Sequence, residues 1–197
     1  MKRKVGIYGG SFNPIHYGHV ELGRFFLREG DLDEIWYVVS PHNPLKDCST
    51  LLDDNLRLQM VEEALKDEPR LCASDYEFHL PHPSYMWNTL QSLSRDYPDC
   101  LFTLLIGGDN WTVFNKWYHS EDILSNYQIC IYPRKGDDID SSSLPSNVSV
   151  LCGAPLINIS STEIRERLRN GLPVRDYVPN LTEHAEKEMS CQLARNK

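Results

Sequence analysis

Short apolar runs with β-branched or aromatic residues recur along the chain and predict buried strands. Between them, apolar residues recur at the spacing of one helix face, as at Leu58, Val61 and Leu65. Strands that alternate with helices predict a Rossmann-like, doubly wound α/β fold, in which a parallel sheet carries helices on both faces. The predicted strands are residues 5–8, 35–40, 101–106, 127–132 and 148–151, and the predicted helices are residues 20–28, 55–66 and 85–97.

Two glycine-containing polar motifs directly follow predicted strands, at residues 9–19 and 107–109. In a doubly wound sheet, ligands bind at the carboxyl ends of the strands, where the strand order reverses. We therefore expect the two motifs to meet at one edge of the sheet.

Three further segments lack a strong apolar period. Residues 41–53 and 135–147 are rich in Pro, Ser, Asp and Gly, and they are interpreted as active-site lids or exposed connections, with the exposed connection favoured for 135–147. Residues 182–193 contain good helix formers but few apolar positions, so a surface helix is expected there.

The composition allows one sizeable core, because 197 residues of which 41% are hydrophobic suffice for a single domain over residues 1–197. A net charge of −8 disfavours a broad surface for nucleic acid or anionic membranes, so local positive groups must hold any anionic substrate. The lack of an apolar leader or long apolar run predicts a cytoplasmic protein. Six cysteines without metal-ligand spacing are expected to be reduced thiols rather than three disulfides.

The motif at residues 9–19, GGSFNPIHYGH, predicts an anion site at a strand–helix junction. Gly9 and Gly10 allow the backbone to approach a ligand closely, and the amides at the start of the following helix favour anions. His16 and His19 can each donate a ring N–H to a phosphate oxygen. The simpler alternative is a connecting loop with two incidental histidines.

A second helix start lies near the C-terminus, in the ISSTEIR segment at residues 159–165. Ser160, Ser161 or Thr162 can cap the amides that follow, and Arg165 lies one turn after Thr162. Hydroxyls, free amides and a guanidinium at a helix start suit the β- and γ-phosphates of a nucleotide. A plain capped surface helix is the alternative.

The two motifs resemble the paired-histidine HxGH element and the ISSTxIR element of the nucleotidyltransferase superfamily, in the order that the superfamily has them. The resemblance is densest to the bacterial nicotinate-nucleotide adenylyltransferase family. It implies the nucleotidyltransferase type of the α/β fold. It also implies transfer of AMP from ATP to nicotinate mononucleotide with release of pyrophosphate, in NAD biosynthesis.

The same resemblance implies that the paired histidines and the second helix start hold the triphosphate, while Gly107 and Asp109 contact the adenosine ribose. A carboxylate suits adjacent ribose hydroxyls, although Asp109 could also cap a helix over residues 110–114. The residues implied for ATP are Gly9, Ser11, Phe12, His16, His19, Gly107, Asp109, Ser160, Ser161 and Arg165, and the implied catalytic residues are His16, His19, Lys46 and Arg165.

For the pyridine nucleotide, the resemblance points to residues 84–90 and 110–118. Trp117 is implied to stack on the pyridinium ring, although core packing suits it equally. Thr89 and nearby amides are implied to bind the nicotinate carboxylate, and Lys46 to act from a loop that departs from the family's Pro-Pro-His-Lys run. The implied residues are Ser11, Phe12, Lys46, Tyr85, Thr89, Trp117, Tyr118 and Arg134.

The implied reaction is direct attack of the acceptor phosphate on the α-phosphorus of ATP, without a covalent protein intermediate. Mg²⁺ is expected to bind mainly through the ATP phosphates, without a dedicated protein metal site. The expected partners are the two small-molecule substrates, without nucleic acid or membrane, and a homo-oligomer is left open. Alternatives are nicotinamide mononucleotide or phosphopantetheine as acceptor, or a nucleotide-binding sensor without turnover.

Overall fold

The computed structural model describes residues 2–41, 51–133, 139, 143–153 and 159–195. Within them, six strands form one sheet in the order β3-β2-β1-β4-β5-β6, and every pair of neighbours is parallel. The predicted parallel α/β fold is therefore confirmed. The strands are β1 (Arg3–Gly10), β2 (Glu34–Val39), β3 (Leu71–Ser74), β4 (Cys100–Gly107), β5 (Gln128–Tyr132) and β6 (Val148–Val150).

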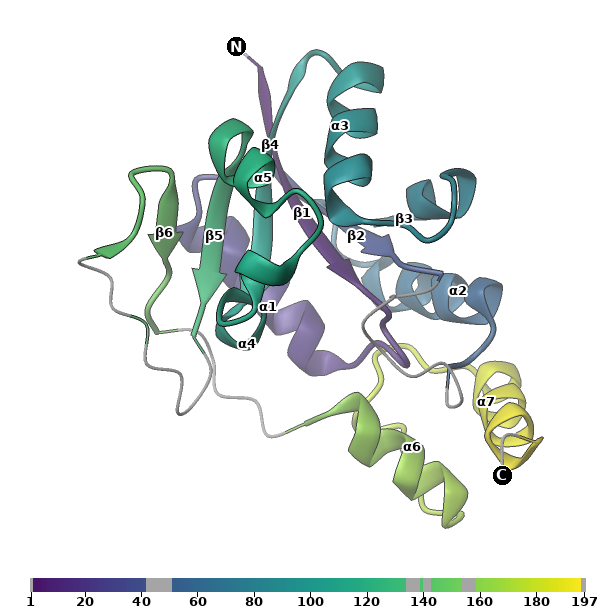
Figure 1. Ribbon diagram of the computed structural model, residues 1–197. Coiled ribbons are helices and arrows are strands. Elements are labelled where there is room, and N and C mark those ends of the chain that lie inside the picture. The colour runs from purple at the N-terminus through teal and green to yellow at the C-terminus, as the bar shows by residue number, and fades with distance from the viewer. Residues whose placement is uncertain (1, 42–50, 134–138, 140–142, 154–158, 196–197) are drawn as a thin grey trace.

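Helices connect the strands and cover both faces of the sheet (Figure 1). The three predicted helices, α1 to α3, are confirmed to within about three residues at each end, a scatter typical of helix boundaries. The α-helices are α1 (Tyr17–Glu29), α2 (Asp54–Leu65), α3 (Met86–Asp96), α4 (Gly108–Trp111), α5 (Ser120–Asn126), α6 (Ser161–Arg169) and α7 (Glu183–Arg195), and two 3₁₀ turns are η1 (Tyr76–His79) and η2 (Phe114–Lys116).

Successive side chains of a strand point to opposite faces of the sheet, so they pack alternately into the two halves of the core. On β1, Tyr8 packs with the residues of α1 and α2, whereas Val5 and Ile7 pack with α3 and α5 on the other face. All three side chains are at most 5% exposed. Burial of both faces explains why this strand is apolar on consecutive residues.

The strand order reverses between β1 and β4, which lie side by side with Ile7 opposite Leu104. Their carboxyl ends therefore deliver residues 9–19 and residues 107–109 to the same edge. The predicted meeting of the two motifs is confirmed.

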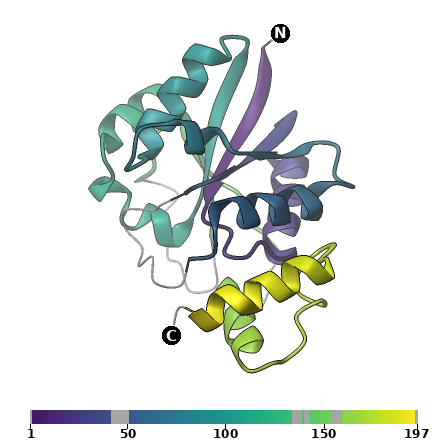
Figure 2. The same ribbon diagram turned by 90° about the vertical axis from the view of Figure 1, so that its right-hand side faces the viewer.

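The helix predicted at the surface over residues 182–193 is present as α7, and one of its faces is buried. Ala185, Met189 and Leu193 are at most 4% exposed and pack into the core. Figure 2 shows this helix in yellow, next to α2. The amide of Asp53 also donates to Gln192 Oε1 at 2.8 Å. Three apolar residues at four-residue spacing are few, but they form one stripe on the buried face.

The cysteines at the described positions, all but Cys48, carry free thiols, as expected of reduced cysteines. None of the helices in the described part of the chain has the length and apolar content that a membrane span requires.

Candidate nucleotide site

The loop at residues 9–16 runs from the end of β1 to the start of α1 and places two histidines together. His16 occupies the N-cap of α1, and its amide donates to Nδ1 of His19 at 3.2 Å. The two imidazole rings lie 3.8 Å apart, centroid to centroid, and are inclined by 30°. His16 is only 7% exposed, whereas His19 is half-buried. The predicted pair is therefore assembled at a helix start, with His19 the more accessible ring.

Phe12 supports this pair from within the core. Its backbone takes the left-handed conformation, with φ of 41°, which turns the ring inward. The ring is 3% exposed and lies 5.2 Å from the ring of His19, nearly perpendicular to it, and 5.6 Å from that of Tyr8. Phe12 is thus placed beside the site as a packing residue, while Ser11, half-buried, lies in the loop itself.

Helix α6 approaches the same loop from the C-terminal part of the chain. The Ser161 hydroxyl donates to the carbonyl oxygen of Pro14 at 2.9 Å, and Arg165 Nη1 donates to that of Asn13 at 2.7 Å. Residues 152 positions apart are therefore in direct contact. Ser160, one of the three predicted caps, is the N-cap of α6 and accepts from the Glu163 amide at 3.1 Å. The structure brings the two predicted phosphate motifs together.

Arg165 is half-buried, and only some of its N–H groups are hydrogen-bonded within the described part of the protein. Its Nη2 donates to Thr162 Oγ1 at 3.3 Å, whereas its buried Nε has no hydrogen-bond partner among the described residues. Burial lowers the pKa of Arg165, and nearby Arg169 lowers it further, with Glu166 opposing. An arginine nevertheless stays charged in proteins, so a cation with spare hydrogen-bonding capacity faces the loop.

Gly107 and Asp109 lie at the adjacent strand end. A Cβ on Gly107 would come within 2.4 Å of Asp109 Oδ1 and 3.2 Å of the Tyr132 ring, so the carboxylate lies close over the glycine. Asp109 is exposed within the first turn of α4, and Gly107 occupies the N-cap. The alternative prediction of Asp109 as a helix cap is therefore wrong, because the helix begins one residue before it.

Thr89, predicted to bind the acceptor, is fully buried and bonded within the protein. Its hydroxyl donates to Glu77 Oε1 at 2.9 Å, and its amide donates to the Tyr85 carbonyl oxygen at 3.1 Å. The amides free at the start of a helix are those of its first turn, which in α3 precede Thr89. Thr89 therefore contributes to the position of that turn rather than presenting its own hydroxyl.

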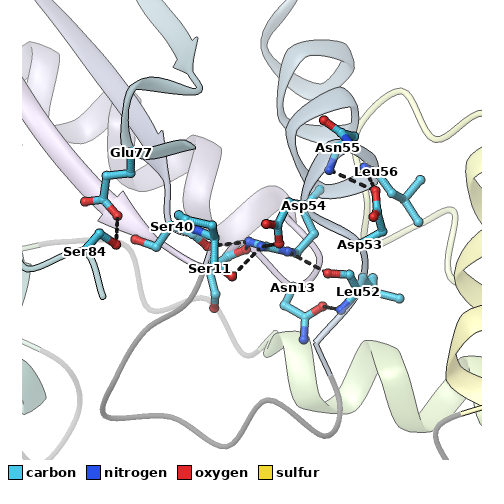
Figure 3. Close-up of polar contacts among 12 residues, drawn as sticks. Ser11, Asn13, Ser40, Leu52, Asp53, Asp54, Asn55, Leu56, Glu77 and Ser84 are labelled. Carbon is cyan, nitrogen blue, oxygen red and sulfur yellow. Dashed lines mark hydrogen bonds and ion pairs between the residues drawn. The ribbon is translucent and has the colours of Figure 1, made fainter. Parts of the chain in front are cut away.

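Glu77 was missed by sequence reasoning and lies at the centre of this region. It is 2% exposed and accepts a hydrogen bond from Ser84 Oγ at 3.0 Å (Figure 3). Burial raises the pKa of the Glu77 carboxyl, and the bonds from Ser40, Thr89 and Ser84 oppose that rise. An isolated glutamate in a short turn carries no sequence signal of burial.

Aromatic side chains gather in the segments predicted to bind the acceptor. The rings of Tyr85 and Tyr118 lie 4.7 Å apart at 31°, and Tyr118 is 48% exposed. Trp117 is half-buried, with its ring 5.4 Å from Phe114, and its buried Nε1 has no hydrogen-bond partner among the described residues. Core packing thus explains the burial of part of the Trp117 ring. The predicted Lys46 and Arg134 lie outside the described residues.

Arg57 is a second buried charge that sequence reasoning missed. The predicted apolar face of α2 is confirmed, because Val61 and Leu65 are buried and Leu58 is partly buried against the core, and the buried face also includes Arg57 and Met60. The spacing of three and four residues to two large apolar side chains was the signal that places position 57 on that face. Its contacts are described below.

Comparison with known proteins gives a consistent result. Residues 7–167 match the family model described as cytidylyltransferase-like. A protein of Bacteroides fragilis named "Probable nicotinate-nucleotide adenylyltransferase" is 49% identical over 177 residues, which are 90% of this chain and 88% of that protein. One of Bacteroides thetaiotaomicron with the same name is 43% identical over 196 residues, 99% of this chain and 96% of that protein.

A solved structure supports the fold. The Plasmodium falciparum nicotinic acid mononucleotide adenylyltransferase complexed with NaAD superposes with a TM-score of 0.76 at 21% identity, covering 95% of this chain and 94% of that one. At this identity the likeness concerns the arrangement of the sheet and helices.

Proposed function

The chain belongs to the cytidylyltransferase-like family and, within it, to the nicotinate-nucleotide adenylyltransferases, and from this premise we propose how its residues transfer AMP from ATP to nicotinate mononucleotide in NAD biosynthesis. The observation that carries the proposal is the contact of Ser161 and Arg165 with the carbonyl oxygens of Pro14 and Asn13. This contact brings the starts of α1 and α6 together. Helix starts favour anions, so the two create one region of positive potential.

The triphosphate of ATP is placed between these two helix starts. His19 and Arg165 donate to its oxygens, and the unpartnered Nε of Arg165 gains an acceptor there. His16 packs against His19 from the buried side and holds its ring in place. Asp109 and Gly107, at the end of β4, receive the ribose, whose hydroxyls donate to the carboxylate.

The acceptor is placed at the start of α3. The amides of the first turn of α3 bind the nicotinate carboxylate, and the Thr89–Glu77 bond holds that turn in position. The exposed Tyr118 ring and Trp117 contact the pyridinium ring. Lys46 and Arg134 remain candidates for the acceptor phosphate from the part of the chain that the structure does not describe.

The chemical step then needs no protein nucleophile. An oxygen of the acceptor phosphate, already ionised at neutral pH, forms a bond to the α-phosphorus, and the bond from that phosphorus to the β-phosphate oxygen breaks. The electron pair leaves with pyrophosphate. His19 and Arg165 stabilise the charge that develops on the transferred and leaving groups, so catalysis consists of positioning and electrostatic stabilisation.

Nucleotidyltransferases generally use a divalent metal ion with ATP, and we propose Mg²⁺ for this chain. Among the described residues no group of three or more His, Cys, Asp or Glu side chains is placed to hold a metal ion. A cation that is held chiefly by phosphate and water oxygens, as Mg²⁺ commonly is, does not require such a group. When bound, Mg²⁺ would supply neutralisation of phosphate charge.

The test is a comparison of acceptors. The purified protein is assayed for pyrophosphate release with ATP, Mg²⁺ and either nicotinate mononucleotide, nicotinamide mononucleotide or phosphopantetheine, and the product mass is measured. We expect the highest kcat/KM with nicotinate mononucleotide. A preference for either other acceptor would contradict the assignment, and no release with any of them would indicate a nucleotide sensor. His19→Ala, prepared in parallel, reports contaminating activity.

A further inference from the structure

A fully buried arginine in α2 binds the backbone of two separate loops at the carboxyl edge of the sheet. Arg57 is 0% exposed, and its Nη1 donates to the carbonyl oxygens of Ser11 at 2.5 Å and Ser40 at 2.9 Å. Its Nε donates to the carbonyl oxygen of Leu52 at 3.0 Å, and its Nη2 to that of Pro41 at 3.3 Å. Figure 3 shows Ser11, Ser40 and Leu52 gathered around this set of dashed contacts.

Every N–H donor of the guanidinium is in use. Besides the four carbonyl oxygens, Nη2 donates to Asp54 Oδ1 at 2.6 Å, which gives five contacts for the five donors of an arginine. Burial lowers the pKa of Arg57, and Asp54 opposes that shift. A buried charge is costly unless it is paired and hydrogen-bonded throughout, so this geometry must be retained as a whole.

The bound carbonyl groups belong to both sides of the site. Ser11 lies in the loop that leads to His16, whereas Ser40 follows β2. The Ser40 side chain opposes the rise that burial causes in the pKa of Glu77, which accepts hydrogen bonds from Ser84 and Thr89 beside the start of α3, the proposed acceptor side. The Leu52 amide donates in turn to Asn13 Oδ1 at 3.1 Å. Asn13 lies in the loop at residues 9–16, which is proposed to bind the triphosphate and is called the phosphate loop below. One guanidinium therefore lies between the proposed ATP groups and the proposed acceptor groups.

We propose that Arg57 is a positioning residue for nucleotidyl transfer: it sets the distance between the phosphate loop and the acceptor side without touching either substrate. The proposal rests on the proposed function. A planar guanidinium can hold carbonyl groups of two loops in one plane, whereas a lysine ammonium has three donors around one point. If the two loops are no longer held at this distance, the proposed reacting groups move relative to each other.

The test compares Arg57→Lys with Arg24→Lys. Arg24 is a matched control because it also makes several contacts, to Glu21 and Glu68, but on the exposed surface of α1. We expect Arg57→Lys to lower kcat about 100-fold, since displacements near 1 Å can cost that much. The KM values should change less than kcat, and Arg24→Lys should stay within about twofold of wild type, the typical scale for an exposed ion pair.

Two measurements separate positioning from stability. Kinetics are recorded well below the melting temperature of each variant, so that only folded protein is compared. Asp54→Asn removes the negative charge but keeps an Oδ1 acceptor for Nη2 as well as the four carbonyl contacts, so it should retain most of the wild-type kcat. If Arg57→Lys is folded and its kcat is within threefold of that of Arg24→Lys, the proposal is overturned.

A measurement on the wild type decides the case in which Arg57→Lys does not fold. The side-chain N–H signals of Arg57 are followed by NMR as a non-hydrolysable ATP analogue is added, with those of Arg24 as reference. We expect the Arg57 signals to shift and the Arg24 signals to stay, and unchanged Arg57 signals overturn the proposal. If wild type and Arg24→Lys both lack AMP transfer, it is the proposed function that fails.

Discussion

Burial distinguishes the two histidines of the pair. His16 is almost completely buried at the N-cap of α1, whereas the ring of His19 is partly accessible and rests on Phe12. The His19 ring is already held in place by Phe12 and His16, so it loses little conformational freedom when it binds a phosphate. This favours His19 as the donor that stabilises the charge of the transition state.

We predict opposite kinetic signatures for His19→Ala and Trp117→Ala. The first removes a proposed transition-state donor and should lower kcat about 100-fold or more, with a smaller change in the KM for the acceptor. The second removes a proposed aromatic contact of about 0.5–2 kcal/mol and should raise the KM for the pyridine nucleotide about 2- to 30-fold. Steady-state kinetics check both. Equal effects on both parameters in both variants would contradict the proposed division of roles.

Glu77 predicts a pH dependence of stability. Burial raises the pKa of its carboxyl above the ordinary value of 4.5, so the folded state binds the proton more tightly than the unfolded state. The resulting stability is present below pH 4.5 and is lost as the pH rises through the higher pKa of the folded state. Glu77→Gln removes this titration, so wild type should lose stability relative to the variant as the pH rises.

Urea unfolding of both proteins between pH 4 and 8 measures the difference. Glu62→Gln, on the exposed face of α2, controls for the change of charge. A wild-type-minus-Glu77→Gln difference that is constant across this range would show that the buried carboxyl does not titrate differently on folding.

Among the elements, the starts of α2 and α6 are capped in the same way but border different surroundings. Asp53 accepts from the amides of Asn55 and Leu56 at 3.0 and 3.1 Å, and Ser160 accepts from that of Glu163. Both starts contact the loop at residues 9–16, through Leu52 and Ser161 respectively, but only the α6 start carries residues proposed to bind the triphosphate. The two caps therefore offer a matched comparison of stability and function.

We predict that Ser160→Ala and Asp53→Ala each cost about 1 kcal/mol of stability, which lowers Tm by about 2–4 °C in a chain of this size. Only Ser160→Ala should also raise the KM for ATP, because it loosens the proposed phosphate-binding turn. Thermal unfolding and ATP titrations check the two effects. A rise in KM of the same size in Asp53→Ala would remove the special role of the α6 start.

Some helices and strands could not be predicted from the pattern of apolar residues. The first and longest strands were predicted because both faces of each are buried, whereas β3 was missed because Leu71 is the only large apolar residue of a four-residue edge strand. Helices α4 and α5, of four and seven residues, are too short to show a periodic stripe. The burial of one face of α7 was not predicted, because its apolar stripe is one residue wide.

At the scale of the whole molecule, we propose that residues 1–197 form a single domain. Met189 of α7 is fully buried in the same part of the core as Tyr8 of β1, close to opposite ends of the chain. A C-terminal helix that packs into this core should unfold together with the sheet.

We predict that Met189→Ala lowers the free energy of unfolding by about 2–5 kcal/mol, the usual cost of a cavity left by a large buried side chain. Lys187→Ala, exposed on the same helix, should stay within about 0.5 kcal/mol of wild type. Circular dichroism and tryptophan fluorescence are followed in the same urea titrations. Two separate transitions for the two probes would contradict the single domain.

The sequence by itself determined the class of fold, the order of the main elements, and the two segments that we propose bind phosphate. These depend on local properties: the apolar period of each segment, glycine where the backbone must turn, and hydroxyls that cap helix amides. The tertiary structure decided the strand order, the contact of Arg165 with the Asn13 carbonyl oxygen, the bond of Thr89 to Glu77, and the burial of Arg57. These depend on which distant residues meet, and no local pattern specifies the partner that stabilises a buried charge.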